Sequence, residues 1–134
     1  MIPLYFQSYL SMTRARSTLE QVIKLRLKAF DLSLTQFHML DLLVNQKAAT
    51  PVQFAEPLGM TSAGVTTVAD QLEHKQMIER QRNQPDRRTV RLNLTPEGAQ
   101  VHAAASAVLC PQEEESHRLP ASYFLALNSL LKAF

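Results

Sequence analysis

Cysteine, glycine and tryptophan are scarce in this chain of 134 residues. It contains one cysteine, Cys110, three glycines and no tryptophan. A single cysteine cannot form an intramolecular disulfide, and there is no cysteine cluster to hold zinc or an iron–sulfur centre. We therefore expect a protein of a reducing compartment, the cytoplasm, with no metal and no cofactor.

Long apolar runs are also missing. No run approaches the roughly 18 residues needed to span a bilayer, and residues 1–10 lack the basic start and the small-residue cleavage site of a secretory signal. The apolar share of 46% and the charged share of 19% are those of a packed globular protein. We expect one soluble, untargeted domain that does not contact a membrane.

Positive charge is concentrated in one short stretch. The net charge is only +2, which says little about partners. Residues 80–91, however, hold five arginines and a single acid, Asp86, a local charge of +4. The planar guanidinium of arginine suits phosphates and guanine edges better than the lysine ammonium does. The stretch is therefore a candidate DNA contact, with an ordinary solvated hairpin as the alternative.

Apolar residues at helical spacing predict amphipathic helices near both ends of the chain. Over residues 11–30 they recur every three or four positions, at Met12, Ala15, Leu19, Val22, Ile23, Leu27 and Phe30. A last helix from Pro120 places a second apolar stripe between Tyr123 and Phe134, after a break at Pro111. A short chain cannot cover both stripes if these helices project from its core, so we expect a symmetric partner.

Residues 34–47 predict a central helix with Thr35 as its N-cap. Apolar residues surround most of it, with Phe37, Leu40, Leu43 and Val44 on the expected inner side and Met39 and Leu42 on the other. A helix that is apolar on most sides is usually buried. The remaining elements should therefore pack around this one.

Two helices joined by a tight turn should follow. Thr50-Pro51 begins a short helix that ends near Leu58, before Gly59. Thr61 or Ser62 caps the next helix. Its core stripe is Val65, Val68, Ala69 and Leu72, and its outer face is left with Ser62, Ala63, Gly64, Thr66 and Thr67.

A hairpin and a fifth helix complete the pattern. Residues 77–81 and 90–94 read as strands, the second with Val90, Leu92 and Leu94 pointing inward, and turn-forming residues lie between them. Thr95-Pro96-Glu97 then begins a helix with a cap, a first-turn proline and an acid at the positive end of the helix dipole.

This order predicts a mainly α (α+β) fold in which a winged helix-turn-helix, residues 35–98, is flanked by a helical dimerisation region, residues 1–34 and 99–134. A helix with small residues in its first two turns can enter the major groove of DNA. A hairpin loop with arginines can reach a nearby phosphate or the minor groove. Double-stranded DNA is the expected partner.

Several short motifs between Leu34 and Gly98 carry a family resemblance. They are Leu34-Thr35-Gln36-Phe37, Ala55 with Leu58-Gly59, Val65-Thr66 with Asp70-Gln71-Leu72-Glu73, and Asp86-Arg87-Arg88 followed by Leu94-Thr95-Pro96-Glu97-Gly98. In these residues the chain resembles the MarR family of bacterial transcriptional regulators. The resemblance implies a homodimer that binds a pseudo-palindromic operator and acts as a ligand-responsive repressor.

By position, the resemblance also assigns site residues. DNA contacts would come from Thr61, Ser62, Ala63, Gly64, Thr66, Thr67, Arg87 and Arg88. Asp86 would order the hairpin loop by pairing with an arginine, because phosphates repel a carboxylate. Members of the family often bind small aromatic or phenolic acids. Here Phe30, Phe37, His38, Arg14 and Arg16 are the candidate lining of such a site, with plain core packing as the alternative for the two phenylalanines.

Three residues depart from the family pattern. Thr67 stands where relatives commonly have arginine, which removes a long-range contact to DNA. Gln76 replaces a usual glycine, so a left-handed residue there would carry a steric cost unless the helix ends in another way. Pro57 lies late in its helix, deletes one backbone hydrogen bond and should bend or shorten that helix.

Other functions have weaker support. The two departures at Thr67 and Pro57 and the modest net charge allow a winged-helix protein-interaction module that has lost specific DNA binding. The sequence shows neither a nucleophile with a neighbouring base nor a pair of acids, so nothing in it indicates an enzyme. Cys110 is expected to be structural rather than a sensing thiol. His102, Glu113–Glu115 and His117 match no known metal spacing.

Overall fold

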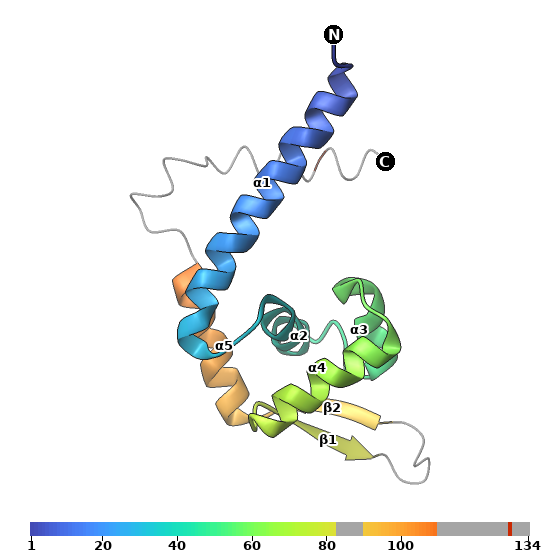
Figure 1. Ribbon diagram of the computed structural model, residues 1–134. Helices are drawn as coiled ribbons and strands as arrows, with labels where there is room; N and C mark the ends of the chain where they lie inside the picture. Colours follow the sequence, from blue (N-terminus) through green and yellow to red (C-terminus); the bar gives the residue numbers. More distant parts are fainter. Residues whose placement is uncertain (83–89, 110–128, 130–134) are drawn as a thin grey trace.

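Helix α2 (Leu34–Val44) lies at the centre of the computed structural model, which describes residues 1–82, 90–109 and 129 (Figure 1). Packed against it are α1 (Leu4–Leu27), α3 (Pro51–Leu58), α4 (Ser62–His74), β2 (Val90–Leu94) and α5 (Pro96–Leu109). The central position predicted for this helix is confirmed. None of the helices in the described part of the chain is both long and apolar enough to cross a membrane.

The N-terminus of α2 is held by Ser33. The backbone N–H of Gln36 donates to Ser33 Oγ (3.1 Å), and the backbone N–H of Ser33 donates to Gln36 Oε1 (3.1 Å). The predicted cap, Thr35, is therefore wrong, because the reciprocal pair of serine and glutamine satisfies two otherwise unpaired N–H groups. The prediction that Val44 faces inward is also wrong, since this last residue of α2 is 40% exposed.

Helix α1 begins at Leu4, earlier than the predicted start at Ser11, and continues after Leu27 into a 3-10 turn, Lys28–Phe30. Pro3 precedes its first turn, where a missing N–H costs nothing. Its C-terminal end packs on α2 and α5, while the rest extends away from the other elements (Figure 1). Leu27 is the one buried residue of this helix.

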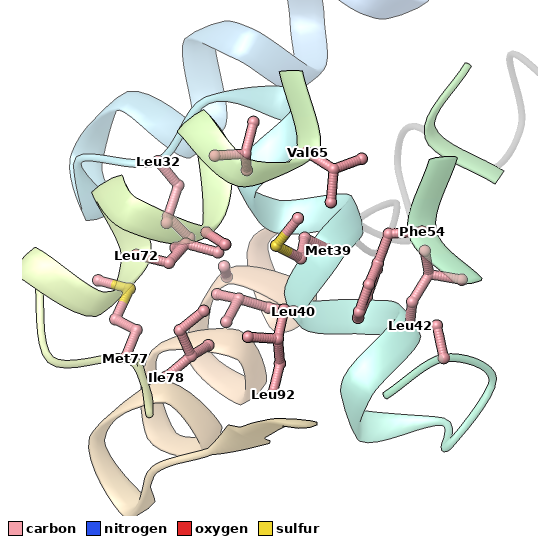
Figure 2. Packing of buried hydrophobic residues seen from close by; sticks show 14 of the residues in the cluster. Leu32, Met39, Leu40, Leu42, Phe54, Val65, Leu72, Met77, Ile78 and Leu92 are labelled. Carbon is pink, nitrogen blue, oxygen red and sulfur yellow. The ribbon is translucent and has the colours of Figure 1, made fainter. Parts of the chain in front are cut away.

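One apolar cluster fills the space between the helices and the sheet (Figure 2). Its buried members are Leu27, Leu32, Met39, Leu40, Leu42, Ala48, Phe54, Val65, Val68, Ala69, Leu72, Met77, Ile78, Leu92 and Ala105. The stripe predicted for α4 lies entirely within it. Met39 and Leu42 are buried although they were placed on the other side of α2, because α3 and α4 cover that side as well.

The hairpin consists of β1 (Ile78–Arg82) and β2, which pair antiparallel with Ile78 opposite Leu94 and Arg82 opposite Val90. The first strand begins one residue later than predicted. The backbone N–H of Leu92 also donates to the carbonyl of Ala49 (2.7 Å), which ties the loop before α3 to β2. The described residues do not include 83–89, where the predicted loop arginines lie. Of the predicted helix after Pro120 they include residue 129 alone.

Helices α3 and α4 are joined by a short turn. Gln53 Oε1 accepts the backbone N–H groups of Ala49 (2.9 Å) and Thr50 (3.1 Å), which fixes the start of α3. Gly59 ends the helix in the left-handed conformation, with φ of 61°, as predicted. Helices α2, α3 and α4 with the hairpin form a winged helix-turn-helix, which confirms the predicted fold class.

The C-terminus of α4 uses a left-handed residue without glycine. Gln76 has φ of 59°, its N–H donates to the carbonyl of Glu73 (2.9 Å), and the N–H of Met77 donates to the carbonyl of Leu72 (3.0 Å). The expectation that α4 ends in another way, because Gln76 replaces the usual glycine, is therefore wrong. The chain keeps the usual ending with a residue that is disfavoured there.

Substituting Gln76 by glycine is expected to stabilise the protein by about 0.5–1 kcal/mol, because relief of the left-handed strain exceeds the added entropy of the unfolded chain. Urea unfolding measures the difference. Gln76→Ala, which keeps the strain, serves as the control and should leave the stability nearly unchanged. A glycine variant less stable than the alanine variant would contradict this explanation.

Candidate nucleic-acid interface

The outer face of α4 is lined by small and hydroxyl side chains. Thr61 caps the helix by accepting the backbone N–H of Gly64 (3.2 Å). Of the predicted contact residues on this helix, Thr61, Ser62, Ala63, Thr66 and Thr67 are exposed and Gly64 is half-buried. The exposure of this face agrees with the sequence analysis, and its contact with DNA stays a prediction.

The two threonine hydroxyls of this face are already used as donors. Thr66 Oγ1 donates to the carbonyl of Ser62 (3.0 Å), and Thr67 Oγ1 donates to the carbonyl of Ala63 (3.1 Å). Each oxygen keeps its lone pairs, so in this geometry it acts as an acceptor. Such a group suits the amino groups of adenine or cytosine in the major groove.

Acidic residues occupy the C-terminal half of the same face. Asp70 follows Thr66 by four positions and Glu73 follows it by seven, so all three lie on one side of the helix. The side chain of Asp70 is 60% exposed and that of Glu73 is 40% exposed. No lysine or arginine occurs between Ser62 and His74. The helix therefore contributes no cation of its own to this surface.

A cation reaches the face from the neighbouring strand. Arg80 of β1 pairs through Nη2 with Asp70 Oδ1 and through Nη1 with Glu73 Oε2. Partial burial lowers the pKa of Arg80, but the hydrogen bonds and charges of the two carboxylates outweigh this effect and raise its pKa. The guanidinium therefore stays charged at physiological pH.

Arg80 belongs to the basic stretch of the sequence, but its pairing with two acids was not predicted. The signal was two acids three positions apart on the outer side of a helix that lacks cations. Arg82 and Arg91 of the same hairpin are exposed. Asp86, Arg87 and Arg88 lie outside the described residues, so the structure does not place the predicted loop contacts.

The C-terminal end of α4 is also linked to the start of α2. Lys75 Nζ lies 3.2 Å from Asp31 Oδ2 and donates to Gln36 Oε1 (3.2 Å). Gln36 Nε2 in turn donates to Gln71 Oε1 (2.8 Å). An open cavity of about 340 Å³ lies at this junction, lined by Lys24, Lys28, Asp31, Leu32, Ser33, Gln36 and Lys75.

None of the predicted ligand residues lines that cavity. Phe30 and Phe37 are half-buried against the core, and His38 is exposed. Arg14 and Arg16 are exposed on α1, about 20 Å along the helix from Phe30 at 1.5 Å per residue. Within one chain the structure therefore does not bring the five residues together.

Phe37 has a different neighbour. Its ring stacks on His102 of α5 with centroids 5.1 Å apart, and His102 Nε2 lies 3.0 Å from Asp41 Oδ1. These contacts join α5 to α2. In the described part of the chain no three His, Cys, Asp or Glu residues are grouped as a metal site. Cys110, Glu113–Glu115 and His117 lie outside it.

Comparison with known proteins assigns the chain to a family. The family model described as MarR matches residues 32–90, which run from the loop before α2 to the first residue of β2. The transcriptional repressor MprA of Escherichia coli K12 is 35% identical over 95 residues, covering 69% of this chain and 52% of the relative. The chain belongs to the MarR family. It spans about half the length of the curated relatives it matches.

Solved MarR-family structures share the fold. A mutant MarR from Escherichia coli complexed with operator DNA matches with a TM-score of 0.81 and 22% identity, over 98% of both chains. The transcriptional repressor CouR bound to a 23-mer DNA duplex matches with a TM-score of 0.82 and 24% identity, over 99% of this chain and 97% of that one. At 22–24% sequence identity, these two matches show a shared fold and nothing more specific.

The structure explains the most specific part of the MarR resemblance, Leu94–Gly98. Thr95 Oγ1 accepts the backbone N–H of Gly98 (3.0 Å) and donates to the carbonyl of Gln76 (2.7 Å). The backbone N–H of Thr95 donates to the carbonyl of Met77 (3.1 Å). The motif thus caps α5 and ties it to the segment that follows α4.

Proposed function

We propose that this MarR-family protein is a transcriptional repressor that binds a pseudo-palindromic DNA operator as a homodimer. The observation that carries the proposal is the exposed face of α4, with small and hydroxyl side chains in its first two turns, beside a hairpin rich in arginine. The names of the relatives agree, because MprA is called a repressor and the matched MarR and CouR structures contain DNA.

In this proposal α4 is the recognition helix. It enters the major groove with Thr61, Ser62, Ala63, Gly64, Thr66 and Thr67, while Arg87 and Arg88 of the hairpin loop bind the backbone or the minor groove, held by Asp86. Residues 1–34 and 99–134 form the dimerisation region around the winged module, residues 35–98. Two half-sites should then lie roughly 34 Å apart.

Response to a small acid is part of the proposal. Three lysines and one aspartate line the cavity beside α4, with Lys75 paired to Asp31 and Lys24 paired to Glu20. The net charge of +2 on these four lining residues suits the carboxylate of an aromatic or phenolic acid. Arg14, Arg16, His38, Phe30 and Phe37 are the alternative site, which a second protomer would have to complete. A ligand at either place regulates DNA binding only if it prefers one of two conformations.

The proposal is tested by titrating the protein against the intergenic DNA upstream of its own gene. Two salt concentrations and competitor DNA separate specific from general binding, and aromatic acids are then added to the complex. Specific, salt-dependent binding by a dimer is the expected result. Binding no tighter than to competitor DNA would contradict it and favour a protein-interaction module, to which the acidic face of α4 would be better suited.

Thr66→Ala is expected to weaken binding to the preferred operator roughly tenfold and to change the ranking of operator variants, because base contacts carry specificity. Thr18→Ala removes the same kind of hydroxyl, bonded to the carbonyl of Arg14 (3.1 Å) on α1, and should change neither. Competition binding with single-base operator variants measures both. An equal loss on every sequence would show that Thr66 does not read bases.

A further inference from the structure

Helix α4 has an unusual charge for a helix that approaches DNA. Its segment from Ser62 to His74 contains two acids and no lysine or arginine. Both acids share the face of Thr66, so they turn toward the phosphates when that face enters a groove. Two uncompensated carboxylates there would repel the DNA backbone.

Arg80 compensates for this charge. It comes from β1, yet its guanidinium contacts both carboxylates, one through Nη1 and the other through Nη2. Its side chain is 27% exposed, less than either partner, so the cation lies between the strand and the helix rather than out in solvent. A planar fork can bridge two carboxylates, which the single ammonium of lysine does less well.

We propose that Arg80 is a positioning residue for DNA binding that neutralises Asp70 and Glu73, and thereby lets the recognition helix approach the phosphate backbone. The inference rests on the proposed DNA binding. A purely structural role would be modest, because ion pairs that are this exposed contribute little to stability. Loss of Arg80 should therefore affect operator affinity far more than unfolding.

The first test is Arg80→Gln, titrated against the operator alongside the wild-type protein. We expect roughly tenfold weaker binding at low salt, and a ratio of the two affinities that approaches one as salt is raised, because salt screens the repulsion. The melting temperature should fall by no more than a few degrees. Arg80→Lys keeps the charge and should bind with intermediate affinity.

The second test asks whether Arg80 acts by neutralising the two carboxylates or by packing between the strand and the helix. Adding Asp70→Asn and Glu73→Gln to Arg80→Gln should restore the affinity to within about threefold of wild type, because the repelling charges are gone. The matched control adds Glu20→Gln and Glu97→Gln instead, which removes two acids from α1 and α5. That control should bind the operator as weakly as Arg80→Gln does.

Each outcome decides the inference. Wild-type affinity for Arg80→Gln would overturn it, and so would a triple variant that binds no better than Arg80→Gln or a control that recovers equally. If the wild-type protein bound the operator no more tightly than competitor DNA, both the proposed function and this inference would be refuted. Specific wild-type binding with an unaffected Arg80→Gln variant would refute the inference alone.

Discussion

Replacing Gly98 by alanine is expected to lower the free energy of unfolding by about 3 kcal/mol. A Cβ atom at position 98 would lie 2.0 Å from the carbonyl oxygen of Met77 and 2.9 Å from its carbonyl carbon. That oxygen already accepts the backbone N–H of Thr95 (3.1 Å), so it is not free to move. The added methyl group would push α5 away from the segment that joins α4 to β1.

Chemical unfolding of Gly98→Ala and of a matched variant, Gly64→Ala, tests this explanation. Gly64 is also helical, but the nearest atom to an added Cβ is the flexible end of Met60, at 3.0 Å. Alanine there should be neutral or stabilising through its higher helix propensity. If both variants were equally stable, the close approach at Gly98 would not be what requires glycine in the motif.

Local signals in the sequence predicted most of the elements. Thr50, Thr61 and Thr95 were identified as helix starts, because a hydroxyl cap followed by a proline or by an apolar stripe is a short-range pattern. The cap of α2 was misplaced, since Ser33 and Thr35 both suit the role. Only the side chain of Gln36, three positions after Ser33, decides between them.

The candidate site was less predictable, because its contacts cross a chain reversal. The sequence showed which face of α4 is exposed, as periodicity alone determines this. It did not show that Arg80 would lie across Asp70 and Glu73, which depends on how β1 packs against the helix. The grouping of Arg14 and Arg16 with Phe30 failed within one chain because α1 is a continuous helix that separates them.

The longer α1 also enlarges the surface expected to bind a second copy of the chain. Tyr5, Tyr9, Met12 and Leu19 follow one another at spacings that place them on one side of α1, and each is at least 40% exposed. Exposed aromatic and apolar side chains on one helix face are typical of an interface. The periodicity over residues 11–30 predicts only the part of this stripe from Met12 onward.

Tyr9→Glu combined with Met12→Glu is therefore expected to raise the dissociation constant of the dimer by roughly ten-thousandfold or more. A symmetric interface would lose four apolar side chains, each worth about 1.5–3 kcal/mol when buried. Operator affinity should fall with it, since one winged module makes half of the contacts. Sedimentation over a range of concentrations and operator titration measure the two effects.

The control places the same added charge on the opposite side of the helix. Gln7→Glu with Gln21→Glu adds two acids at exposed positions about half a turn away from Tyr9. This variant should remain a dimer and bind the operator as the wild type does. A Tyr9→Glu, Met12→Glu protein that stayed dimeric at the same concentrations would show that this face of α1 does not form the interface. Loss of the dimer in both variants would indicate general repulsion between acidic chains rather than a local contact.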